Sequence, residues 1–187
     1  MTGLKLTRRA ATAALAATLA APAMAQSAGD PQNTLFLDTK DGRITIRLRP
    51  DLAPKHVAQI KALVKRNFYD GLNFHRVIEG FMAQTGDPKG NGTGGSDLPN
   101  IPAEFSSTPF KRGTVGMARS SDPNSANSQF FICLGDASFL NNQYTVIGEV
   151  TSGLDVVDKI KKGNSAQNGS VQNPDKIVRM RLAADAK

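Results

Sequence analysis

Two apolar segments in the middle of this 187-residue chain constrain its fold more than any other feature. The first, residues 74–87 (FHRVIEGFMAQTGD), predicts two short strands around a tight turn, because Val77 is β-branched and Gly80 permits a reversal of the chain. The second, residues 128–133 (SQFFIC), is too short for an independent helix and is rich in phenylalanine, which indicates a buried strand. Arg76 therefore lies within a few residues of large apolar side chains.

The first 25 residues have the three parts of a secretory signal peptide. They carry three basic and no acidic residues, then the apolar run AATAALAATLAAPAMA, and they end on the small residues Ala23 and Ala25. A transmembrane anchor is the competing interpretation, but the run is mostly alanine and is shorter than the ~20 apolar residues that a bilayer requires. We therefore expect cleavage before Gln26 and a mature periplasmic protein outside the membrane. The pair Arg8-Arg9 hints at twin-arginine export, so the choice between that route and Sec stays open.

Removal of residues 1–25 would leave a chain that is long enough for one domain with a substantial core. We assign residues 26–32 to a short N-terminal segment and 33–187 to that domain. The formal net charge of +7 would fall to +4, because three of the 23 basic residues leave and the 16 acidic residues stay, and so small a charge does not indicate nucleic-acid binding. The one cysteine, Cys133, cannot form an internal disulfide, and its apolar neighbours indicate a buried thiol. Nothing in the sequence demands more than a monomer.

Hydrophobic periodicity predicts a mainly β fold with two helices. Alternation of apolar and polar residues in 34–39 and 43–49, around an Asp-Gly turn, predicts a hairpin. Helices are expected over residues 54–67 and 152–161, the second with Ser152 as its N-cap. Further strands are expected at residues 74–79, 81–86, 113–118, 128–134, 144–150 and 176–182. Because no βαβ repeat occurs, the pattern favours a closed antiparallel eight-stranded barrel capped by the two helices.

The segment after residue 87 matches two sequence motifs whose structural or cellular context is not met. Residues 90–95 match the dinucleotide fingerprint GxGxxG, but Pro99 and Pro102 preclude the helix that would carry a pyrophosphate. A glycine-rich surface loop is the better interpretation. Asn91 also begins a glycosylation sequon, which matters only in a eukaryotic secretory pathway.

The chain lacks the parts of metal-assisted or nucleophilic hydrolysis. Its two histidines have no metal-ligand spacing: His56 is expected on the polar face of the first helix, and His75 stands beside Arg76. No serine lies in a GxSxG elbow. We therefore expect neither a metal nor a cofactor.

Each central residue alone would be taken as core or as a surface cation, but their order resembles the cyclophilin family of peptidyl-prolyl cis-trans isomerases. FHR is followed by GFM, by a glutamine two residues on, by NGTGG and by SQFFI, with room between them for a loop and a strand. The resemblance covers residues 33–183, including PDLAPKHVAQIKALV and TVIGEVTSGLDVVDKI. It implies the barrel fold and an isomerase domain that accelerates X-Pro bond rotation in exported proteins as they fold.

Prolyl isomerisation needs no nucleophile. Its barrier of about 20 kcal/mol arises from amide resonance, which leaves the prolyl nitrogen without a free lone pair. A donor that is always charged and is aimed at that nitrogen stabilises the twisted amide, and we assign this catalytic role to Arg76. We expect Phe81, Met82, Phe131 and Leu140 to hold the pyrrolidine ring while the peptide rotates.

The resemblance assigns four further polar or backbone positions. Gln84 matches the glutamine that supports the arginine, and Gln129 matches a second glutamine near the substrate. Ala118 and Arg119 match the stretch whose backbone binds the residue before proline. Arg119 replaces the common asparagine, so its backbone contact is expected and its side-chain role is open.

The sequence departs from the family pattern at three positions, and two of these departures, Phe139 and Tyr144, resemble exported bacterial members. Phe139 stands where many eukaryotic members have tryptophan, Tyr144 where they have histidine, and Glu79 replaces a proline in the turn. Phe139 and Tyr144 are expected to contact the substrate. Without an indole N–H at position 139, we expect only weak binding of cyclosporin.

Two functions stay open at this stage. The first is an isomerase that acts on proline-containing peptides and on unfolded or partly folded proteins. The second is a binding or chaperone module of the same fold in which catalysis is incidental. The presence of Arg76 favours the isomerase, because a module that only binds could dispense with this residue. The sequence does not identify the client proteins or the preferred residue before proline.

Overall fold

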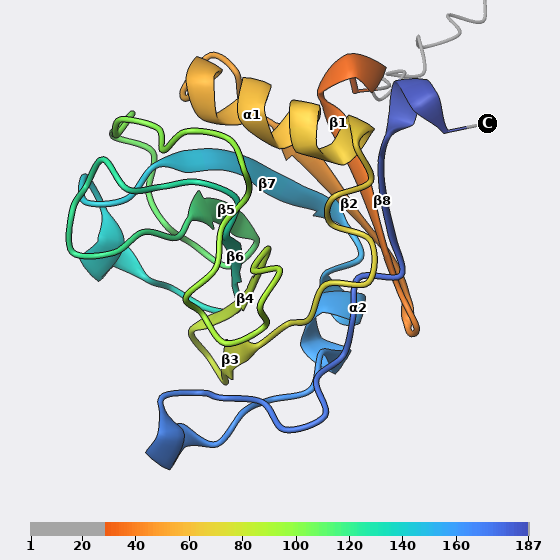
Figure 1. Cartoon of the computed structure of the whole chain (residues 1–187), viewed down its shortest axis with the longest axis vertical. Helices are drawn as coiled ribbons and strands as arrows, with labels where there is room; N and C mark the ends of the chain where they lie inside the picture. The colour runs from red at the N-terminus through yellow and green to blue at the C-terminus, as the bar shows by residue number, and fades with distance from the viewer. Residues whose placement is uncertain (1–28, 187) are drawn as a thin grey trace, which may run out of the picture.

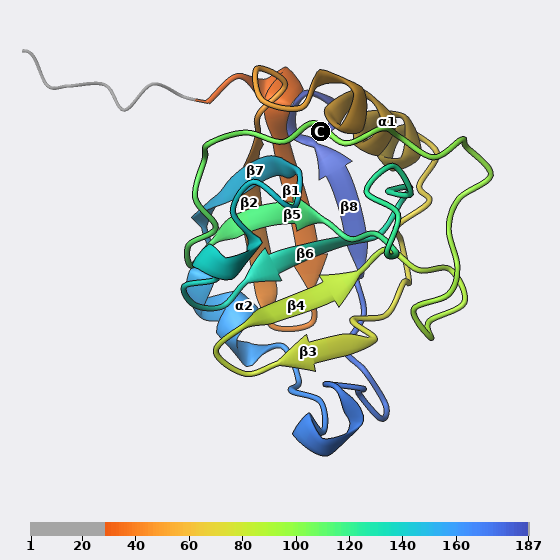
Figure 2. The ribbon, with the colours of Figure 1, turned by 90° about the vertical axis from the view of Figure 1, so that its left-hand side faces the viewer.

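The computed structural model describes residues 29–186, so the expected signal peptide and its cleavage site lie outside the described residues. One antiparallel sheet has the strand order β3-β4-β6-β5-β7-β2-β1-β8 and curls around the core (Figures 1 and 2). The strands and helices are β1 (Thr34–Thr39), β2 (Gly42–Leu48), α1 (Pro54–Lys65), β3 (Arg76–Ile78), β4 (Met82–Thr85), β5 (Thr114–Met117), β6 (Phe130–Cys133), β7 (Val146–Ser152), α2 (Leu154–Lys159) and β8 (Arg179–Leu182).

The expectation of a closed barrel is not confirmed, because the sheet is an open half-barrel. Its end strands β3 and β8 share no ladder in the described part of the chain. Instead, the irregular segment between α2 and β8 runs beside β3, where it makes isolated bridges from Asn73 to Lys176 and from Arg76 to Ser170. β3 is only three residues long, so it offers too short an edge for a continuous ladder across this gap.

Two apolar clusters lie on opposite faces of β4 and β6. The larger cluster fills the half-barrel and includes Ala83, Phe130 and Ile132, together with the buried stripe of α1. The smaller cluster contains Met82 and Phe131. Since successive strand residues point to opposite faces, β6 is buried on both sides and contributes to both clusters. The sheet thus carries an apolar surface on its outer face in addition to its core.

The local predictions are largely confirmed. The hairpin of β1 and β2 pairs Thr39 with Gly42 around a two-residue turn, and Cys133 is buried, which raises the pKa of its thiol to about 12. The prediction of Ser152 as N-cap is wrong. Gly153 occupies that position with φ +87°, and a Cβ there would collide with the carbonyl oxygen of Arg43. None of the helices between residues 29 and 186 combines the length and the apolar character of a membrane span.

The prediction that His56 lies on a polar helix face is wrong as well, because its side chain is 0% exposed. The carboxylate of Glu104 accepts hydrogen bonds from His56 Nδ1 at 2.7 Å and from the backbone N–H groups of Lys55 and His56 at 3.2 and 3.1 Å. α1 begins after Ala53, which has no side-chain oxygen to cap it. Glu104 therefore caps α1 from a distant loop and fixes that loop to the helix.

The buried pair has a defined protonation state at neutral pH. Burial lowers the pKa of His56, so the imidazole is neutral and donates its Nδ1 proton. Burial alone would raise the pKa of Glu104, but hydrogen bonds from the His56 side chain and from backbone N–H groups lower it below its usual value. Glu104 is therefore charged and His56 neutral.

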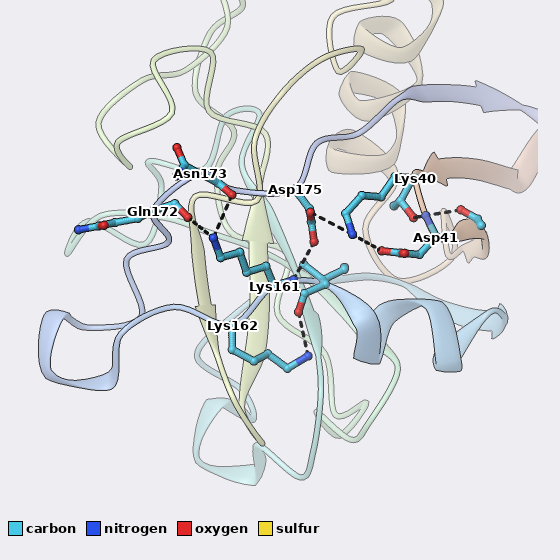
Figure 3. A network of polar contacts seen from close by, with 10 residues as sticks. Lys40, Asp41, Lys161, Lys162, Gln172, Asn173 and Asp175 are labelled. Atoms are coloured by element: carbon cyan, nitrogen blue, oxygen red, sulfur yellow. Dashed lines mark hydrogen bonds and ion pairs between the residues drawn. The ribbon is translucent and has the colours of Figure 1, made fainter.

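The segment between α2 and β8 is anchored by the polar network in Figure 3. The Asp175 carboxylate accepts the backbone N–H of Lys161 at 2.8 Å and pairs with Lys40 Nζ at 3.4 Å. Lys161 Nζ in turn donates to the carbonyl oxygens of Gln172 at 2.6 Å and Asn173 at 3.4 Å. These contacts tie the segment to itself and to the β1–β2 hairpin, which fixes it as it passes β3.

Candidate functional site

A cavity of about 610 Å³ opens on the outer face of the half-barrel. Its wall combines residues of β3, β4 and β6 with residues from three loops and from the chain just after β5. The lining residues are His75, Arg76, Phe81, Met82, Gln84, Gly90, Asn91, Gly92, Thr93, Ala118, Arg119, Phe131, Leu140, Tyr144, Gln167, Asn168, Ser170 and Val171. The smaller apolar cluster, which contains Met82, Phe131 and Leu140, forms the apolar floor of this cavity.

Arg76 is held from two sides at the start of β3. Its Nε donates to the backbone carbonyl of Asn168 at 2.9 Å, and Nη2 donates to Asn168 Oδ1 at 2.8 Å. On the other side Nη1 donates to Gln84 Oε1 at 3.2 Å, and Gln84 is the cross-strand partner of Arg76 in β4. Burial lowers the pKa of Arg76, but an arginine stays charged at neutral pH. The guanidinium is thus fixed and charged at the cavity wall.

Gln84 is connected through Gln129 to the glycine-rich loop of residues 90–95. Its Nε2 donates to Gln129 Oε1 at 2.9 Å, and Gln129 Nε2 donates to the carbonyl oxygens of Gly94 at 2.8 Å and Gly92 at 3.1 Å. The loop is further organised by Asp87, whose buried carboxylate accepts several of its backbone N–H groups. Burial alone would raise the pKa of Asp87, and these hydrogen bonds lower it below its usual value. The glycine-rich loop expected from the sequence therefore forms one ordered wall of the cavity.

The apolar floor is preorganised by aromatic packing. Met82, Phe131 and Leu140 are almost fully buried, and the Phe131 ring meets Tyr144 edge-on at a centroid distance of 6.0 Å. A Cβ at Gly116 would lie 2.6 Å from the ring of Phe131, so only glycine leaves room for that ring. The floor can therefore accept a small apolar ring without rearrangement.

Nine of the eleven site residues expected from the sequence line this cavity: Arg76, Phe81, Met82, Gln84, Ala118, Arg119, Phe131, Leu140 and Tyr144. Gln129 instead lines an adjoining cavity of about 390 Å³ that shares Gln84, Ala118 and Arg119 with the first. Phe139 lines neither cavity. Its side chain is 62% exposed and packs against Phe81 with ring centroids 5.2 Å apart, so it extends the apolar rim.

Nine of the eighteen lining residues were not expected as site residues from the sequence, among them Asn168 and His75. Asn168 has φ +53°, and its left-handed backbone lets both its carbonyl and its side chain face Arg76. No sequence pattern connects residues 168 and 76, although Asn168-Gly169 is a turn signal. His75 lines the cavity, and neither of its buried ring nitrogens has a hydrogen-bond partner in the described structure. Burial lowers its pKa, so this imidazole is neutral at neutral pH.

The lining residues define the chemistry that is available. In the described part of the chain they include two guanidinium groups and an apolar floor, but no carboxylate, cysteine or lysine. Within residues 29–186, no group of three or more His, Cys, Asp or Glu side chains could hold a metal ion. The arrangement can orient an apolar ring and donate charged hydrogen bonds to an atom beside it.

Residues 34–182 match the family described as cyclophilin type peptidyl-prolyl cis-trans isomerase. A protein of Brucella suis named probable peptidyl-prolyl cis-trans isomerase is 63% identical over 172 residues, covering 86% of this chain and 88% of the relative. A peptidyl-prolyl cis-trans isomerase of Helicobacter pylori is 44% identical over 132 residues, which cover 68% of this chain and 80% of the relative.

Solved cyclophilin structures are similar in fold. The cyclophilin AquaCyp293 from Hirschia baltica aligns with a TM-score of 0.76 at 29% identity, covering 85% of this chain and 77% of that one. A cyclophilin type isomerase of Cryptosporidium parvum, crystallised in the presence of the dipeptide Ala-Pro, aligns with a TM-score of 0.72 at 26% identity. That alignment covers 80% of this chain and 98% of the other.

Proposed function

Because the chain belongs to the cyclophilin-type peptidyl-prolyl cis-trans isomerases, we propose that it catalyses X-Pro bond rotation in the cavity beside Arg76. One observation carries the assignment of this site. A guanidinium that is held by Asn168 and Gln84 borders a preformed apolar floor, and no carboxylate of the described residues lines the same cavity.

The proline ring packs on Met82, Phe131 and Leu140, with the prolyl nitrogen toward Arg76. A guanidinium has five N–H groups, and three of those of Arg76 are used by Asn168 and Gln84, which leaves two for the substrate. As the amide twists, the lone pair localises on the prolyl nitrogen and accepts one of them. The donor is fixed before the reaction, so the transition state gains this hydrogen bond without reorganisation.

Proline-containing peptides are the substrates that this cavity fits, and the Cryptosporidium parvum isomerase was crystallised with such a dipeptide. The test is a protease-coupled assay of a short X-Pro peptide. We expect the cis-to-trans rate to rise in proportion to the concentration of this protein. A binding or chaperone module would instead bind the peptide and leave the rate at its uncatalysed value.

We propose weak inhibition by cyclosporin, because Phe139 presents an apolar ring and no N–H donor. A ligand carbonyl left without its donor costs ~1 to 3 kcal/mol, which is roughly one to two decades of affinity. Phe139→Trp should tighten inhibition at least several-fold and change peptide turnover much less. Inhibition curves of both proteins in the same coupled assay measure this. Equal inhibition of the two would mean that position 139 does not contact the drug.

We also propose export to the periplasm through the N-terminal segment, which the sequence supports by its basic start, apolar run and small residues before Gln26. The mature protein should begin at Gln26. Intact-mass spectrometry of the protein recovered from the periplasm measures this. A form that keeps residues 1–25 in the membrane fraction would contradict cleavage and favour an anchor.

A further inference from the structure

Two arginines in the cavity wall differ from most others in residues 29–186. Six of the nine arginines in this range form ion pairs with carboxylates: Arg43, Arg47, Arg49, Arg66, Arg112 and Arg181. Arg76, Arg119 and Arg179 have no carboxylate partner in the described part of the chain. Arg76 is explained by its proposed catalytic role. Arg119 lines the same cavity and has no role assigned to its side chain.

The Arg119 guanidinium is nevertheless held in one position. It lies over the ring of Tyr144, 4.3 Å from the centroid. Its Nη2 donates to the carbonyl oxygen of Gln143 at 2.9 Å, and Nη1 donates to that of Ser120 at 2.9 Å. These partners are a ring face and backbone dipoles, which orient the cation and leave its positive charge uncompensated. The side chain is thus fixed before a substrate arrives, so binding an anion costs little conformational entropy.

Among the described residues, no negatively charged side chain lines the two cavities beside Arg119. The 610 Å³ cavity and its 390 Å³ neighbour meet at Ala118 and Arg119, and neither is lined by an Asp or Glu side chain. Asp87, behind the glycine-rich loop, is 1% exposed and its charge is bound by backbone N–H groups. The Asp122 carboxylate accepts the backbone N–H of Asn124 within its own turn. A peptide in this groove therefore meets a positive field.

We propose that Arg119 selects substrates with an acidic side chain at one of the two positions before the proline and disfavours basic side chains there. The inference rests on the proposed function, which places the proline beside Arg76, and on the expectation from the family resemblance that the residue before the proline lies along Ala118 and Arg119. A carboxylate at these positions supplies the counter-charge that the groove lacks. Arg119 is partly exposed, so the effect is that of a solvated ion pair and not of a buried one.

The test compares kcat/KM for peptides that carry Glu, Gln or Lys at each of the two positions before proline. For the wild type we expect kcat/KM to be about 3- to 10-fold higher for the Glu peptide than for the Lys peptide at low ionic strength. This ratio should decrease in high salt, as for other partly solvated ion pairs. Arg119→Gln should bring this ratio close to one, and Arg119→Lys should retain part of it. Because a ratio is measured, a general loss of activity in a variant does not affect the result. Arg179→Gln, the same charge change on exposed β8, should leave ratio and activity unaltered.

Two outcomes would overturn the inference. They are a wild-type ratio near one at both positions before the proline, and a ratio that Arg119→Gln leaves unchanged. An uncharged Ala-Pro peptide in the same series separates this failure from failure of the proposed function. If the Glu-to-Lys ratio of kcat/KM is near one and the Ala-Pro peptide is turned over rapidly, only the role of Arg119 is contradicted. If the Ala-Pro peptide is not turned over, the proposed function itself is contradicted.

Discussion

Replacing Arg76 by Ala should lower kcat/KM on a short X-Pro peptide by about 100-fold or more, ~2.7 kcal/mol, which is the scale for removing one preorganised donor. The guanidinium is the group that can donate to the prolyl nitrogen beside the apolar floor, and a water molecule in its place would have no fixed orientation. The fold should survive, because the Arg76 partners Gln84 and Asn168 are polar groups that line the cavity and can bond water instead. Kinetics by the protease-coupled assay and circular dichroism of the same samples measure the two effects.

Graded variants sharpen the test of Arg76. Arg76→Lys keeps the charge but cannot bond Asn168 and Gln84 in the same planar geometry, so its activity should lie between wild type and Ala. Asn168→Ala removes the Oδ1 acceptor but keeps the backbone carbonyl that accepts from Nε, so it should cause a smaller loss than Arg76→Ala. Arg179→Ala is the matched control and should have no effect. An Arg76→Ala protein that isomerises at nearly the normal rate would remove Arg76 from the mechanism.

Glu104→Ala should lower the free energy of unfolding by about 2–4 kcal/mol, the sum of a lost helix cap and a buried donor left without an acceptor. Glu104 accepts hydrogen bonds from the Nδ1–H of fully buried His56 and from two backbone N–H groups of α1. Urea unfolding of wild type and variant at neutral pH measures the difference. Glu149→Ala is the matched control, because its partner Arg47 is exposed and such pairs contribute ~0–1 kcal/mol.

The effect of Glu104 has a definite pH dependence. Its folded-state pKa lies below the ordinary value of 4.5, so its contribution is present above pH 4.5 and is lost as the pH falls through the lowered folded value. The difference between wild type and Glu104→Ala should therefore shrink in strong acid. A difference in unfolding free energy that does not shrink in strong acid would contradict the capping role. So would a difference at neutral pH that is no larger than that of Glu149→Ala.

Patterns that repeat along the chain predicted local structure well. The alternation in β1 and β2 and the aromatic run of β6 reflect side chains that point to a buried face, so position in sequence determines burial directly. His56 shows how such a pattern can be misinterpreted. It lies at helical spacing from Ile60 and Leu63 on the buried face of α1, and only its polar type suggested exposure. Glu104, its distant acceptor, makes that burial tolerable.

Features that depend on contacts between distant segments were not predictable. The open edge of the half-barrel follows from the path of the chain between α2 and β8, which has no periodicity of its own. The same path brings Asn168 to Arg76, 92 residues away in sequence. The family resemblance supplied Gln84 and Gln129, but the hydrogen bonds from Arg76 through both to the carbonyls of the glycine-rich loop are visible only in three dimensions.

Exchange NMR spectroscopy of a short Ala-Pro peptide tests the central claim most directly, because it observes binding and rotation in the same sample. With wild-type protein we predict exchange cross-peaks between the cis and trans forms, which the uncatalysed peptide is too slow to show. With Arg76→Ala we predict that the peptide resonances still shift on binding but that the cross-peaks are lost. Cross-peaks of undiminished intensity with Arg76→Ala would contradict the assignment of Arg76 as the donor to the prolyl nitrogen.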